Sequence, residues 1–178
     1  MQYPATHLVV MGVAGSGKST IAAALSQQLG WDCAEADEFH PQANIQKMSK
    51  GIPLQDEDRW PWLETLSGAL CEAAEQKGVA VGACSALKRA YRDFLTEKAG
   101  EPILFVFLDG NIDVIRKRIE ARAHEFMNPK LLDSQFATLE RPADDENVLR
   151  VDVADPVETI ATRVVKELTH LKVFKRGQ

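Results

Sequence analysis

The chain has 178 residues, 45% of them hydrophobic, and we expect a single domain over residues 1–178 with a substantial core. Its net charge of −5 gives no general attraction to nucleic acid or acidic membranes, so an anionic substrate has to be held by a local basic cluster. Three cysteines without C-x-x-C spacing, no N-terminal signal pattern and no run of transmembrane length predict a cytoplasmic protein that neither binds nucleic acid nor enters a membrane.

The first predicted element is a strand over His7–Met11, which is a short apolar, β-branched run. Residues 12–19 then match the phosphate-binding pattern G-x-x-x-x-G-K-[ST], and the spacing of Ile21, Leu25 and Leu29 predicts a helix directly after it. The motif needs this strand–loop–helix frame, because its glycines let backbone N–H groups surround phosphate oxygens at a helix N-terminus. The sequence therefore predicts a binding site for a nucleoside triphosphate.

Two side chains of this motif have defined tasks. Lys18 reaches the β- and γ-phosphates, and Ser19 offers its hydroxyl to Mg²⁺. The alternative interpretation of residues 12–19 is a glycine-rich turn with an exposed lysine. The remaining predicted nucleotide-binding residues of the loop are Gly12, Val13, Ala14, Gly15, Ser16, Gly17 and Thr20.

Strands and helices then alternate to the end of the chain. Strands are predicted over residues 33–35, 79–83, 103–108 and 148–153, and helices over 61–77, 88–98 and 112–119, with a last helix carrying Ile160, Val164 and Leu168. This alternation predicts an α/β fold, a parallel sheet with helices on both faces. Ligands of such sheets bind at the carboxyl ends of the strands, so polar residues there are the candidates for function.

The first polar cluster follows the second predicted strand. Asp37 is placed to orient a substrate hydroxyl or to hold a Mg²⁺-bound water, and His40 could contact the substrate. Two alternatives remain open at this point. Asp37 could instead cap the following short helix, and His40, which precedes a proline, could be a packed turn residue.

The second cluster follows the third predicted strand. Lys88 and Arg92 lie four residues apart and are expected to share one helix face, where two cations could hold a carboxylate or the transferring phosphoryl group. The alternative is a solvated helix face. Farther on, Asp109 is at the end of an apolar run, but we interpret Asp109-Gly110-Asn111 as a turn that caps the next helix.

The third cluster is a pair of arginines, Arg118 and Arg122, again four residues apart. Residues 128–145 interrupt the strand–helix alternation and contain two prolines. Such an interruption suggests a lid, spanning about residues 118–145, that excludes water and delivers the arginines to the nucleotide. The alternative is an amphipathic helix whose basic face is only solvent-exposed.

In its motifs the chain resembles the bacterial gluconate kinase family over nearly its whole length. The matching segments, besides the phosphate loop, are 36–37, 40–41, 44–48, 51–54, Asp56, 58–63, 84–88 and 91–93, followed by scattered positions between residues 124 and 142. The resemblance implies phosphorylation of D-gluconate at its C6 hydroxyl by ATP, an adenylate-kinase-like fold with strand order 2-3-1-4-5, and a homodimer.

The chemistry of this reaction assigns roles to the candidate residues. Lys18, Asp37 and Arg122 are the predicted catalytic residues, and Arg118 and Arg122 the lid arginines that stabilise transition-state charge. Arg59, Lys88 and Arg92 are the predicted cations that bind the sugar acid or the transferring phosphoryl group, and Asp37 and His40 are the other predicted substrate-binding residues. Kinases of shikimate or of a nucleoside monophosphate, and a nucleotide-binding regulatory module without transferase activity, remain as alternatives.

Overall fold

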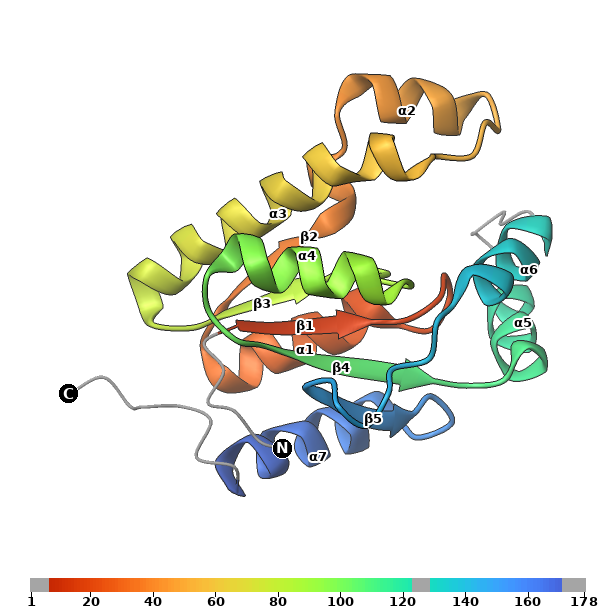
Figure 1. Cartoon of the computed structure of the whole chain (residues 1–178). Coiled ribbons are helices and arrows are strands. Elements are labelled where there is room, and N and C mark those ends of the chain that lie inside the picture. The colour runs from red at the N-terminus through yellow and green to blue at the C-terminus, as the bar shows by residue number, and fades with distance from the viewer. Residues whose placement is uncertain (1–6, 123–128, 171–178) are drawn as a thin grey trace.

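The computed structural model describes residues 7–122 and 129–170, which are built around a five-stranded parallel sheet. The sheet order is β2-β3-β1-β4-β5 (Figure 1), as the resemblance implied. Neighbouring strands run parallel throughout, and Leu8, for example, lies between Val81 and Leu104. The strands are β1 (His7–Met11), β2 (Asp32–Glu35), β3 (Ala80–Ala83), β4 (Ile103–Asp109) and β5 (Val148–Asp152).

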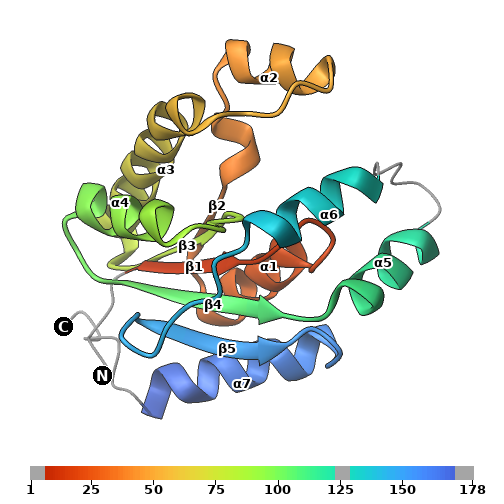
Figure 2. The same ribbon diagram turned by 45° about the vertical axis from the view of Figure 1, so that its right-hand side comes forward.

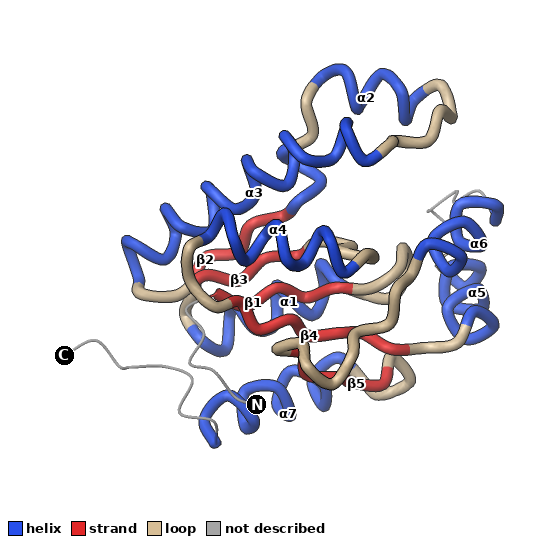
Figure 3. Tube along the Cα trace, in the orientation of Figure 1, coloured by secondary structure: helices blue, strands red, loops and turns tan. Residues whose placement is uncertain are grey.

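Helices cover both faces of the sheet (Figure 2). One face carries α1 (Lys18–Leu29) and α7 (Val157–His170), and the other carries α3 (Asp56–Lys77) and α4 (Arg89–Ala99). Beyond the carboxyl ends of the strands, three further helices project (Figure 3), and a short 3₁₀ helix, η1 (Ala36–Phe39), leads from β2 to the first of them. These helices are α2 (Gln42–Ser49), α5 (Ile112–Ala121) and α6 (Pro129–Thr138).

Two layers of apolar side chains attach the helices to the sheet, because alternate residues of a strand point to opposite faces. On β1, Leu8 and Val10 belong to the layer under α1 and α7, whereas Val9 and Met11 belong to the layer under α3 and α4. All four side chains are buried. Among the described helices, none is long and apolar enough to cross a membrane.

The boundaries of two helices differ from the prediction. α3 was predicted to begin at Pro61, but the helix begins earlier and Pro61 lies inside it. It begins at Asp56 because Gln55 and Asp58 form a reciprocal capping box. Lys88, expected inside α4, is instead its N-cap residue. The additional turn of α3 brings Asp56 close to Lys88.

Candidate active site

The loop between β1 and α1 has a positive φ at three positions, Gly12, Gly15 and Gly17, a backbone conformation that favours glycine. Gly15 has a φ of 76°, and a Cβ atom there would lie 2.5 Å from Cγ1 of Ile119 in α5. Gly17, with a φ of 96°, is the N-cap residue of α1, so the first free N–H groups of that helix follow it directly. The loop therefore opens a helix N-terminus to an anion and packs closely against α5.

Two polar side chains of this loop, Lys18 and Ser16, have few hydrogen-bond partners among the described residues. The ammonium of Lys18 donates to the carbonyl of Val13 at 3.0 Å, and burial lowers the pKa of Lys18, with Asp37 and Glu35 opposing that effect. The hydroxyl of Ser16 is buried without a hydrogen-bond partner among the described residues. A triphosphate would supply acceptors to both groups, so the loop fits ATP. Lys18 is only partly exposed, unlike the lysine of an ordinary surface turn.

Ser19, the predicted Mg²⁺ ligand, donates a hydrogen bond to Oε2 of Glu35 at 2.9 Å. Glu35 is the last residue of β2, and the sequence analysis read it only as part of a strand. Its carboxylate can orient the Ser19 hydroxyl or bind a metal-bound water, which are the usual tasks of a carboxylate beside Mg²⁺. The signal that could have found it is its position at the carboxyl end of a strand, two residues before Asp37.

Asp37 lies within η1, and its side chain is 93% exposed. The alternative that Asp37 caps a helix is wrong, because the N-cap residues of η1 and α2 are Glu35 and Pro41. The carboxylate of Asp37 is close enough to Lys18 for its charge to raise the pKa of that ammonium. Its position beside the phosphate loop suits a group that orients an acceptor hydroxyl.

His40 is a packed residue whose ring reaches toward Asp37. Its side chain is 7% exposed, its ring stacks on Trp62 with centroids 4.2 Å apart, and its Nδ1 lies 3.3 Å from Nδ2 of Asn44. Burial lowers the pKa of His40, so the ring is neutral near pH 7. Nε2 lies 4.0 Å from Oδ1 of Asp37. Most of the His40 side chain is therefore packed, as the alternative interpretation predicted, and the Nε2 edge of its ring faces the site.

The buried thiol of Cys84, directly after β3, marks the place where these groups meet. Burial raises the pKa of Cys84 to about 12, and the charges of Lys18, Asp37 and Arg59 also act on it. These three residues come from α1, η1 and α3. The fold therefore gathers the phosphate loop, the candidate base and a cation around the carboxyl end of the sheet.

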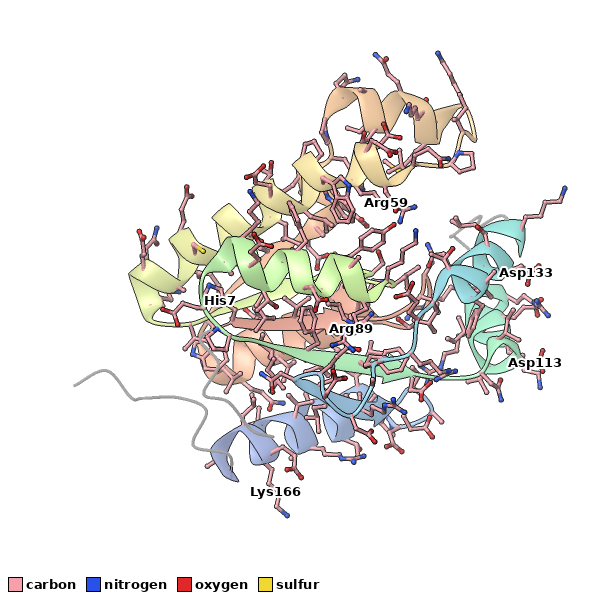
Figure 4. All side chains as sticks on the ribbon, viewed as in Figure 1. His7, Arg59, Arg89, Asp113, Asp133 and Lys166 are labelled. Atoms are coloured by element: carbon pink, nitrogen blue, oxygen red, sulfur yellow. The ribbon has the colours of Figure 1, made fainter. Side chains whose placement is uncertain are left out.

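Arg59 points from α3 into the space on the α6 side of that helix (Figure 4). One terminal nitrogen, Nη2, donates to the carbonyl of Leu54 at 3.2 Å, whereas Nε is buried and has no hydrogen-bond partner among the described residues. The guanidinium lies 5.4 Å from the ring centroid of Tyr91, and the Lys88 ammonium lies 5.5 Å from the same centroid. Two cations therefore share one aromatic side chain.

Arg92 does not belong to this group, which corrects the prediction that it grips the substrate beside Lys88. Its side chain is 2% exposed and forms two hydrogen bonds to Glu146, at 2.6 and 3.0 Å. Nη1 donates to the carbonyls of Ala86 and Leu87. Because Lys88 is the N-cap residue and Arg92 enters the core, the two cations do not share a face.

The predicted lid contains a helix that the sequence analysis treated as an interruption. This helix, α6, contacts the phosphate loop through Oε1 of Gln135, which accepts a hydrogen bond from Ala14 N at 2.6 Å. Arg118 lies next to Ile119, the α5 residue that packs on Gly15, and Arg122 is the C-cap residue of α5. Residues 123–128 of the predicted lid lie outside the described residues.

The turn before α5 is a cap, as predicted. Oδ1 of Asn111 accepts from Val114 N at 2.9 Å, which makes Asn111 the N-cap residue, and Asp109 pairs with Arg141.

Two surface cavities lie away from the phosphate loop. One, of about 660 Å³, lies beside α4 and Glu146, and the other, of about 410 Å³, lies beside Asp109.

Comparison with known proteins identifies close relatives. Residues 14–169 match the family model for shikimate kinase. The chain is 49% identical to a gluconokinase of Gluconobacter oxydans over 146 residues, covering 81% of this chain and 80% of that protein. It is 41% identical to the thermoresistant gluconokinase of Escherichia coli, covering 96% and 94%. The crystal structure of a gluconokinase from Sinorhizobium meliloti is 42% identical, with a TM-score of 0.84 and coverage of 96% and 95%.

Proposed function

The chain belongs to the gluconokinase family of P-loop kinases, and we propose that it transfers the γ-phosphoryl group of ATP to the C6 hydroxyl of D-gluconate, giving 6-phospho-D-gluconate and ADP. The observation that carries this proposal is the convergence of Lys18, Asp37 and Arg59 around Cys84. Gluconate has a primary alcohol at one end and a carboxylate at the other. A carboxylate base near the phosphate loop and a cation farther along α3 match these two ends.

The phosphate loop binds the nucleotide in this proposal. MgATP supplies the phosphoryl group and the metal that neutralises its charge. Lys18 leaves the Val13 carbonyl for the phosphates, and the N–H groups that follow Gly17 bind phosphate oxygens. Ser19 is the proposed Mg²⁺ ligand, and Glu35 accepts its hydroxyl hydrogen, which leaves the oxygen lone pairs to the metal.

Asp37 orients the C6 hydroxyl and accepts its proton as the phosphoryl group is transferred. Its exposure and its nearness to Lys18 support this role. His40 acts as a positioning residue, because its stacked ring is fixed by Trp62 and its Nε2 edge is directed at Asp37. Arg59 is the proposed cation for the substrate carboxylate, because its Nε is buried without a hydrogen-bond partner among the described residues. Lys88, which is paired with Asp56, is proposed to lie beside the bound acceptor.

Arg118 and Arg122 are the proposed arginines for the transferring phosphoryl group. The contact between Gly15 and Ile119 supports this role, because it brings α5 directly against the phosphate loop. The hydrogen bond from Ala14 to Gln135 connects α6 to the same loop. We therefore propose that residues 118–145 form a lid, within a single kinase domain that spans the chain. The cytoplasmic location and the homodimer stay predictions from composition and from resemblance, respectively.

The test is a coupled assay of ADP formation by the purified protein with MgATP and one acceptor at a time. We expect turnover of D-gluconate and at least about hundredfold lower kcat/KM for D-glucose, which lacks the carboxylate. Preference for shikimate or AMP would reassign the acceptor site. Tight binding of ATP without turnover of any acceptor would favour a regulatory module.

A further inference from the structure

Asp56, the first residue of α3, is bound by two side chains of the candidate acceptor site. Its Oδ1 accepts a hydrogen bond from the Tyr91 hydroxyl at 2.5 Å, and its two oxygens lie 3.1 and 3.2 Å from Nζ of Lys88. These contacts lower the pKa of Asp56 and raise that of Lys88, so both groups are charged at neutral pH. Asp56 therefore neutralises the cation that the sequence analysis assigned to the substrate carboxylate.

The ring of Tyr91 is the rigid centre of this arrangement. Tyr91 is buried and packs edge-on against Trp60, with centroids 5.5 Å apart. Arg59 and Lys88 both lie over the Tyr91 ring, and the Tyr91 hydroxyl holds Asp56. With Lys88 paired to Asp56, Arg59 is the cation of this group that keeps a buried N–H without a partner among the described residues.

Asp56 also keeps acceptor capacity that its present partners do not use. A carboxylate has about four acceptor positions. Oδ1 accepts from Tyr91 and Lys88, whereas the one donor to Oδ2 among the described residues is Lys88, at the longer distance, and the Asp56 side chain is 40% exposed. A carboxylate accepts hydrogen bonds and repels another carboxylate. The groups of a sugar acid that suit Asp56 are therefore its hydroxyls.

We infer that Asp56 is a specificity-determining residue that accepts a hydrogen bond from the C2 or C3 hydroxyl of the acceptor acid, while Arg59 binds the carboxylate. This inference rests on the proposed function and adds a substrate preference to it. The site selects polyhydroxy acids, because an acid without the matching hydroxyl leaves the remaining acceptor positions of Asp56 without a donor once the acceptor has displaced water. Tyr91 and Lys88 act as positioning residues, since they fix the Asp56 carboxylate.

The experiment compares kcat/KM for D-gluconate with kcat/KM for its 2-deoxy and 3-deoxy analogues, with MgATP saturating. For the native protein we expect one analogue to be about 10- to 100-fold poorer, the range for one hydrogen bond to a charged group. In Asp56→Ala this ratio should fall to within about threefold, because gluconate loses efficiency and that analogue does not. Asp56→Asn, which keeps one carbonyl oxygen, should give an intermediate ratio.

Asp58→Ala is the matched control. Asp58 is also a carboxylate in the first turn of α3 and is also paired with a lysine, but that lysine is Lys47 in α2. The control should lose stability, because it breaks the capping box, and should keep the native ratio of gluconate to deoxy acid.

The outcomes separate this inference from the proposed function. If the native protein phosphorylates no sugar acid, the proposed function fails. If it phosphorylates gluconate and Asp56→Ala keeps the native preference against both analogues, only the assignment of Asp56 is overturned. Equal use of gluconate and both analogues by the native protein would also overturn it. Tyr91→Phe should shift the ratio in the same direction as Asp56→Ala and add little to it in the double variant.

Discussion

Arg92 and Glu146, 54 residues apart in sequence, form a buried ion pair with 2.6 Å between Nε and Oε2. The same guanidinium donates through Nη1 to the carbonyls of Ala86 and Leu87 at 3.0 and 3.2 Å. Ala86 has a φ of 43°, in the left-handed region that an alanine rarely adopts. The pair therefore fixes a strained loop, and that loop positions Lys88 at the start of α4.

We expect Arg92→Leu to lower the free energy of unfolding by about 3–5 kcal/mol, because it leaves the Glu146 carboxylate buried and unpaired. The melting temperature should fall by about 10 °C. Urea unfolding measures the first quantity. The double variant Arg92→Leu, Glu146→Leu should recover much of the loss, since it removes both charges. A decrease in the free energy of unfolding below about 1 kcal/mol in Arg92→Leu would contradict a structural role and would make Arg92 a candidate substrate ligand again.

The same pair explains why the predicted site was only partly right. Most of the sheet could be predicted because β1, β3 and β4 are short apolar runs and the helices that cover them have periodic apolar stripes, which are local patterns. Whether a cation after β3 points to the substrate or into the core is not local. For Arg92 it depends on Glu146, which β4, α5 and α6 separate from it in sequence. Spacing alone therefore could not separate Arg92 from Lys88.

Glu35 shows the opposite error to Arg92, because it lies near the site but was predicted only as part of a strand. The short strand made its side chain look structural, and its contact with Ser19 depends on how β2 and α1 pack. Asp37 was proposed as a site residue because it follows the end of a strand, and its exposure supports the functional interpretation over the capping one. Rules for strand ends thus locate the site, while packing decides which side chains enter it.

Asp37→Asn tests the proposed base. An amide cannot take the proton of the C6 hydroxyl, so we expect kcat to fall by about 10²-fold or more, with little change in the KM for ATP. Steady-state kinetics with gluconate and MgATP measure both. Glu38→Gln, which changes the neighbouring exposed carboxylate of η1, should keep nearly native activity. Near-native kcat in Asp37→Asn would exclude Asp37 as the base.

Arg59→Ala tests the carboxylate site. Removal of charge-assisted hydrogen bonds to the substrate should raise the KM for gluconate by about 10- to 100-fold and leave the KM for ATP nearly unchanged. The preference for gluconate over glucose should shrink with it, because glucose never used the guanidinium. Lys77→Ala, at the far end of the same helix in a surface pair with Asp32, is the control and should behave as the native protein. An unchanged gluconate KM would move the carboxylate to Lys88.

Stability should decrease as the pH falls below neutrality. Burial lowers the pKa values of His7 and His40 below their ordinary value of 6.5. The unfolded chain therefore takes up protons first as the pH passes below about 6.5, and folding stability is lost from there down to the lower pKa values of the folded protein. Above about pH 6.5 both histidines are neutral in the folded and in the unfolded protein, so they contribute nothing to the pH dependence of the free energy of unfolding.

Urea unfolding at several pH values between about 8 and 5 measures this effect. His7→Gln should flatten the curve below pH 6.5, because glutamine keeps a hydrogen-bonding side chain and does not titrate. The aspartates with lowered pKa values, such as Asp56 and Asp145, act in a separate and more acidic range. A free energy of unfolding that rises as the pH falls from 7 to 6 would have the wrong sign for buried neutral histidines.

Glu35→Gln tests whether Glu35 orients the Mg²⁺ ligand. Ser19 donates its hydroxyl hydrogen to Glu35 at 2.9 Å, and a glutamine can present an N–H group there and reverse the hydroxyl. Loss of such a partner typically costs about 10- to 100-fold in metal affinity. We therefore expect the free Mg²⁺ concentration for half-maximal activity to rise by that factor, with recovery of kcat when Mg²⁺ is saturating. Asp32→Asn, at the other end of β2 in a surface pair with Lys77, should keep the native Mg²⁺ dependence. If Glu35→Gln keeps it as well, the hydrogen bond to Ser19 plays no part in binding the metal.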